Sequence, residues 1–130
     1  MKFSVFSMIL CLIALIYCFA FVAMPVTTME QYGMHLDASG ASIARLFGGA
    51  LLGFAVAFWI IRNQSPESIA VKSVLWATLI SQLVYLIVGL NGILNNLVNS
   101  LGWSSIVLHV LIILVCIYFL RAKKEGAKTA

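Results

Sequence analysis

Charge is what this chain lacks most. Charged residues make up 9% of its 130 residues, whereas a soluble domain carries about 25%. Hydrophobic residues make up 63%, and the mean hydropathy is +1.10. This composition excludes an ordinary soluble domain and predicts an all-α integral membrane protein. The length allows one compact unit at most.

Missing motifs exclude several chemistries. No acidic residue lies within an apolar stretch, so the central carboxylate of a proton-coupled multidrug exporter is absent. The sequence has no CxxC pair, phosphate loop, zinc-binding HExxH or Ser-His-Asp pattern. The two histidines, His35 and His109, lie in a loop and a span, which disfavours a bis-histidine haem. We therefore expect no catalytic residue, no cofactor and no metal.

Cysteine is also scarce, and its spacing argues against a disulfide. Cys11 and Cys18 lie seven residues apart in one apolar stretch, which is about 10 Å along a helix. A disulfide requires Cα atoms within about 7 Å. Cys116 lies in another apolar stretch. We expect three free thiols.

Four apolar stretches are long enough to cross a bilayer, at about residues 3–24, 41–61, 69–90 and 103–120. At 1.5 Å per residue, the 21 residues of 41–61 reach about 31 Å, against a hydrocarbon core of roughly 30 Å. The first stretch also fits a signal peptide, but its length favours retention. We predict four transmembrane helices in an up-down bundle, followed by a basic cytoplasmic tail at residues 121–130.

The basic residues predict the orientation. If the N-terminus, the 62–68 link and the tail share one side, that side holds seven of the eight basic residues: Lys2, Arg62, Lys72, Arg121, Lys123, Lys124 and Lys128. The other side holds only Arg45. The positive-inside rule then predicts cytoplasmic termini and a multi-pass protein of the inner membrane.

The two outer connections contain helix signals. Thr27 with Glu30, or Thr28 with Gln31, could form a capping box for a short helix that ends near Gly33. Ser39 or Ser42 could cap the helix that follows. The Asn-rich stretch 91–102 predicts either an extension of the third span or a separate interfacial helix, broken at Gly102.

Small residues recur along the second span. Gly49, Gly53 and Ala57 fall every fourth residue and form a GxxxG motif with an extension. Small residues allow membrane helices to approach closely. We expect this stripe to pack against other helices of the chain; a contact between two copies is the alternative.

Polar residues near the outer side predict a pocket. Arg45 could anchor an anionic headgroup; alternatively it snorkels to the surface or pairs with Asp37 or Glu30. His109 could carry a proton; alternatively it is neutral and bonded to Gln82, Tyr85 or a backbone carbonyl. Thr78, Gln82, Tyr85 and Gly89 share a helix face that should point inward. The predicted pocket contains eight residues: Glu30, His35, Asp37, Arg45, Gln82, Tyr85, Asn95 and His109.

Two short motifs carry a resemblance. With RLFGGALLGF opening the second span and LVNSLGWSS before the fourth, residues 43–120 resemble small bacterial four-helix inner-membrane proteins of unknown function. The resemblance implies a fold and a location, but no activity and no site residues.

Three functions remain open. The first is a non-enzymatic accessory or scaffold protein that assembles through helix packing with itself or another membrane protein. The second is a lipid-, quinone- or isoprenoid-binding protein or enzyme that uses the pocket around Arg45 and His109. The third is a small transporter. The bilayer is the expected environment, and no nucleic-acid partner is expected.

Overall fold

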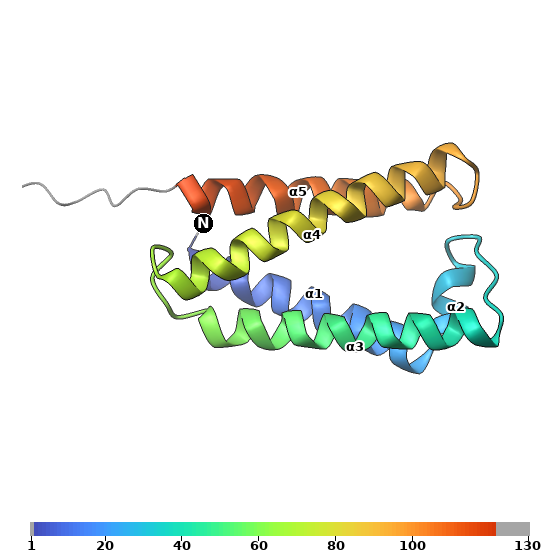
Figure 1. Ribbon diagram of the computed structural model, residues 1–130, viewed down its shortest axis with the longest axis horizontal. Helices are drawn as coiled ribbons and strands as arrows, with labels where there is room; N and C mark the ends of the chain where they lie inside the picture. The colour runs from blue at the N-terminus through green and yellow to red at the C-terminus, as the bar shows by residue number, and fades with distance from the viewer. Residues whose placement is uncertain (1, 122–130) are drawn as a thin grey trace, which may run out of the picture.

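A computed structural model describes residues 2–121, so residues 122–130 of the predicted tail lie outside the described part. The described residues form five helices and no strand (Figure 1). The bounds are α1 Phe3–Ala23, α2 Pro25–Glu30, α3 Ala38–Ile61, α4 Ile69–Leu94 and α5 Gly102–Arg121. Of these, α1, α3, α4 and α5 are long and apolar enough to span a membrane. The four predicted spans are therefore present as helices.

The N-terminal caps differ from those predicted. Helix α3 begins at Ala38, earlier than expected, because Asp37 caps it in place of Ser39 or Ser42. The Asp37 carboxylate accepts a 2.7 Å hydrogen bond from the Gly40 amide. Helix α2 has no capping box, since it begins with Pro25 and its N-cap residue makes no side-chain bond.

The Asn-rich stretch extends the third span only in its first four residues. Helix α4 continues to Leu94, and residues 95–101 form neither a further extension nor a separate interfacial helix. The chain then reverses through Asn96, whose φ of 56° is left-handed. Gly102 does not break a helix but begins α5. A Cβ there would lie 2.8 Å from Val98 Cγ1, so the tight reversal requires glycine.

The long helices pack as two pairs. Helix α1 lies along α3 and α4 lies along α5, and Figure 1 shows the pairs one above the other. Close approach in the first pair occurs at Gly48, where a Cβ would lie 2.8 Å from Val22 Cγ2. At Gly49 and Gly53 a Cβ would meet no described atom within 4 Å. Gly49 and Gly53 therefore do not make the packing contacts expected of them among the described residues, because Gly48 is the glycine that faces α1.

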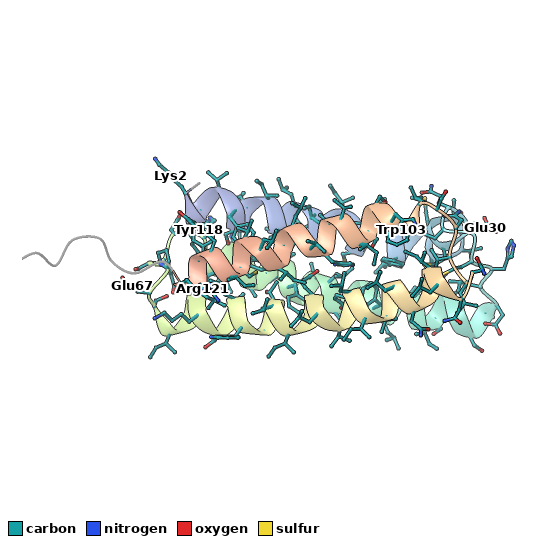
Figure 2. All side chains as sticks on the ribbon, turned by 90° about the horizontal axis from the view of Figure 1, so that it is seen from above. Lys2, Glu30, Glu67, Trp103, Tyr118 and Arg121 are labelled. Atoms are coloured by element: carbon teal, nitrogen blue, oxygen red, sulfur yellow. The ribbon has the colours of Figure 1, made fainter. Side chains whose placement is uncertain are left out.

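The buried core occupies the end of the molecule where α1 begins. Aromatic rings of Phe3, Phe6 and Phe119 lie together, with Phe6 and Phe119 stacked at a centroid distance of 5.3 Å. All three cysteines are free, as predicted. In Figure 2, Lys2, Glu67 and Arg121 lie at this end, whereas Glu30 and Trp103 lie at the other. Tight packing therefore closes one half of the chain and leaves the other half for a cavity.

Candidate ligand-binding cavity

A cavity of about 360 Å³ lies between the two helix pairs. It extends from Phe58 and Ile112, beside the core, to Met34 and Val98 in the outer loops. Its wall is mainly apolar, and every helix contributes to it, α2 through Met29 alone. Pockets of about 300–1,000 Å³ with apolar walls and few polar groups are typical small-molecule sites.

A row of aromatic rings crosses the cavity wall from the first helix pair to the second. Phe21 of α1 meets Phe47 of α3 edge to face, with centroids 5.1 Å apart. Phe47 meets Tyr85 of α4 at 5.8 Å, and Tyr85 stacks on His109 of α5 at 5.5 Å. Rings in these geometries attract each other beyond their burial. The row therefore fixes the position of the His109 ring.

A hydrogen-bonded chain of three side chains faces the cavity. Nδ1 of His109 lies 2.5 Å from Oε1 of Gln82, and Nε2 lies 3.2 Å from Oγ of Ser105. A carbonyl oxygen only accepts, so Nδ1 carries the proton and donates to Gln82. Nε2 then accepts from the Ser105 hydroxyl. Gln82 is one of the partners that the sequence suggested for His109.

Three of the eight predicted pocket residues line the cavity. Gln82, Tyr85 and His109 do, and Thr78 and Gly89 join them on the inward face predicted for α4. The other five predicted residues do not line it. They are Glu30, His35, Asp37, Arg45 and Asn95, and all five are exposed.

The five predicted residues that do not line the cavity lie elsewhere for physical reasons. Arg45 is on the outer surface of α3, which is compatible with snorkelling and rules out an anion anchor inside this cavity. Asp37 is used as the α3 cap. The Asn95 side chain bonds to its own segment, donating to the Asn91 carbonyl at 2.8 Å. Among residues 2–121, no three His, Cys, Asp or Glu side chains are grouped to hold a metal.

Asn99 joins the two outer connections above the cavity. Its side-chain amide donates to the Gln31 carbonyl at 2.8 Å, and its backbone amide donates to the Tyr32 carbonyl at 2.9 Å. Gly33 follows with a φ of 78°, and a Cβ there would lie 3.3 Å from Cβ of Asn99. This contact holds the turn that carries Tyr32 and Met34, two residues of the cavity wall.

Tyr32 brings a phenol to the outer end of the cavity. Burial raises its pKa to about 12, and a hydrogen bond with Tyr17 of α1 contributes to the increase. Both rings line the cavity. Burial of a hydroxyl favours its neutral form. The outer end of the site is therefore polar but uncharged.

Sequence reasoning missed Ser105, Tyr17 and Tyr32 as parts of the site. Ser105 precedes His109 by four residues, the spacing that brings two side chains together on a helix. That spacing was the available signal. Nothing local indicates Tyr17 or Tyr32, because their meeting depends on how the α2 turn folds back over α1.

Comparison with known proteins adds no function. No family model, curated protein or solved structure matches this chain. The resemblance to small bacterial four-helix proteins therefore stays a hypothesis. The described residues form four helices that are long and apolar enough to span a membrane, with a mainly apolar cavity between the helix pairs.

Proposed function

We propose that this protein binds a neutral amphipathic molecule, of the lipid, quinone or isoprenoid class, in the cavity between its helix pairs. The observation that carries the proposal is the combination of an apolar wall with one cluster of uncharged hydrogen-bonding groups, Gln82, Ser105 and His109. An apolar tail would contact the wall, and a polar head would contact the cluster.

The wall favours an uncharged head. None of the cavity-lining residues is Asp, Glu, Lys or Arg. An ion brought into such a site loses its hydration without gaining a partner, which costs several kcal/mol or more. A carbonyl or hydroxyl can instead bond to the Gln82 amide, the Tyr85 phenol or the Ser105 oxygen.

The test is native mass spectrometry of the full chain extracted in mild detergent, followed by identification of any released molecule. We expect an added mass of a few hundred daltons, lost in Gln82→Leu and His109→Leu. Arg45→Ala is the matched control. This change removes a polar residue of α3, and Arg45 does not line the cavity. The added mass should therefore be retained.

Two results would contradict this function. One is a wild-type chain without any bound molecule when extracted directly from membranes. The other is a bound molecule that is lost in Arg45→Ala and kept in both cavity variants, which would place binding on the outer face of α3.

Self-assembly is a second candidate, favoured by the open face of α3. Gly49 and Gly53 are exposed and no described side chain covers them, whereas GxxxG faces commonly contact another helix. The accessory or scaffold function would use this face against a second copy or another membrane protein. We expect Gly53→Leu to reduce the oligomer mass in the same native spectra. An unchanged mass would argue against this candidate.

We propose that the helices form an up-down bundle with cytoplasmic termini in the inner membrane, because the basic residues gather at one end of the helices. Lys2, Arg62, Lys72 and Arg121 belong to the ends of helices near the core, and Arg45 belongs to the other half. We expect an impermeant maleimide added to intact cells to label Ser100→Cys and not Ser65→Cys, in a chain without its native cysteines. The reverse pattern would invert the orientation.

A further inference from the structure

Ser105 differs from the other bonded hydroxyls of the long helices. Thr78, Ser81 and Ser104 donate to backbone carbonyls three or four residues earlier in the sequence, at 2.6–2.9 Å, and Ser7 donates to a backbone carbonyl of α3. This is the usual arrangement for such side chains in membrane helices. The Ser105 hydroxyl is directed instead to a ring nitrogen, Nε2 of His109, at 3.2 Å. The hydroxyl therefore has a base as its partner.

We propose that Ser105 is a nucleophile that accepts the acyl group of a neutral acyl ester held in the cavity. The proposal rests on the function proposed above and names its substrate class. An activated serine has a base within hydrogen-bond reach, and a third group orients that base. Here His109 is the base and Gln82, which accepts from Nδ1, is the positioning residue.

The reaction balances with water as the only co-reactant. Ser105 Oγ bonds to the ester carbonyl carbon while its proton moves to Nε2 of His109. The bond to the alcohol oxygen then breaks, and the alcohol leaves with that proton. Water attacks the acyl-serine, giving its proton to Nε2, and Ser105 recovers a proton as the carboxylic acid is released.

The cavity fits this substrate class. Its apolar wall would hold the acyl chain, and the Tyr85 phenol and the Gln82 amide line the same space as donors for the carbonyl oxygen. Gln82 is neutral, so it stabilises the charged imidazolium less than a carboxylate would. We therefore expect slow turnover and a long-lived acyl-serine.

The test uses a long-chain alkyl fluorophosphonate, whose phosphorus loses fluoride when an activated serine oxygen attacks it. The full chain in lipid nanodiscs is treated with the probe, and the adduct is located by peptide mass spectrometry. We expect one adduct on Ser105, absent in Ser105→Ala. Ser104→Ala is the matched control, because its hydroxyl bonds to the Leu101 carbonyl at 2.6 Å and does not line the cavity. It should label as the wild type does.

The roles of the base and its positioning residue have separate readouts. His109→Leu should slow labelling on the order of 10²-fold or more, the usual contribution of a general base. Gln82→Leu should slow it as well, and Gln82→Glu, which keeps an acceptor oxygen, should restore it. A merely structural role of Gln82 would not give this rescue.

The outcomes separate the two proposals. If the native spectrum shows a bound molecule but wild-type Ser105 forms no adduct, the proposal that Ser105 is a nucleophile is overturned. The binding function then still stands. An adduct that forms equally fast in His109→Leu also overturns the nucleophile. Absence of both bound molecule and adduct overturns both proposals.

Discussion

The hydroxyl of Ser7 in α1 donates a 2.7 Å hydrogen bond to the backbone carbonyl of Phe58 in α3. Ser7 is fully buried, and the bond joins two segments that are 51 residues apart. It is a cross-helix polar contact within the core, where the Phe6 ring meets Phe58 of α3 edge to face and stacks on Phe119 of α5.

Removing that hydroxyl should destabilise the first helix pair. Interhelical hydrogen bonds in membranes contribute about 0.6 kcal/mol on average, with a maximum of about 1.7. We expect Ser7→Ala to lower the free energy of unfolding in mixed micelles by roughly this range. The control is Ser81→Ala, whose hydroxyl bonds within its own helix to Ala77. An equal effect of both changes would show that the cross-helix bond contributes nothing.

Two neighbouring glycines should respond in opposite directions to the same change. Alanine is favoured over glycine in a helix by about 1 kcal/mol. At Gly49 a Cβ meets nothing within 4 Å, so Gly49→Ala should stabilise the monomer. At Gly48 a Cβ would lie 2.8 Å from Val22 Cγ2 and 3.2 Å from the Cys18 carbonyl. Overpacking of this kind costs about 1–3 kcal/mol, so Gly48→Ala should destabilise.

The same pair also tests assembly, with unfolding measured at several protein concentrations in micelles. If Gly49→Ala destabilises the chain only at high concentration, its face is covered by another copy. Stabilisation at every concentration would confirm the open face of α3. A stabilised Gly48→Ala would contradict the close approach of α1 and α3.

Asn99 should control the opening of the outer connections. Asn99→Ala removes the side-chain bond to the Gln31 carbonyl. A net hydrogen bond contributes about 0.5–1.5 kcal/mol, so hydrogen exchange of the amides near Gly33 should accelerate by up to roughly ten-fold. The control is Asn95→Ala, whose amide bonds within its own segment. Unchanged exchange in Asn99→Ala would mean that the backbone bond to Tyr32 alone holds the turn.

Tyr32 should make stability depend on alkaline pH. Its pKa is raised from 10.0 to about 12, chiefly by burial. Between these values the unfolded chain loses the phenol proton and the folded chain keeps it, so stability falls as the pH rises. The difference in tyrosinate absorbance between the wild type and Tyr32→Phe should have its midpoint near pH 12. A Tyr32 midpoint near pH 10 would contradict burial.

Much of the architecture follows from the sequence because long apolar runs have few solutions in a bilayer. Backbone groups without water must bond within a helix, so the runs at 3–24, 41–61, 69–90 and 103–120 could be identified by length alone. The inward face of α4, with Thr78, Gln82 and Tyr85, was also predictable from helical spacing. The four-residue spacing of Ser105 and His109 likewise indicated that these two side chains meet.

Tertiary structure decided which polar residues meet. Gly49 and Gly53 fall on one predicted stripe, but a shift of one residue, about 100° around the helix, turns Gly48 to α1 and leaves these two glycines exposed. Periodicity in the sequence shows which residues share a helix face, but not which helix packs against that face. Lipid tails and apolar side chains solvate an apolar face almost equally. Only the packing of α4 against α5 places Gln82 at His109, and only the reversal at Asn96 brings Asn99 to Gln31.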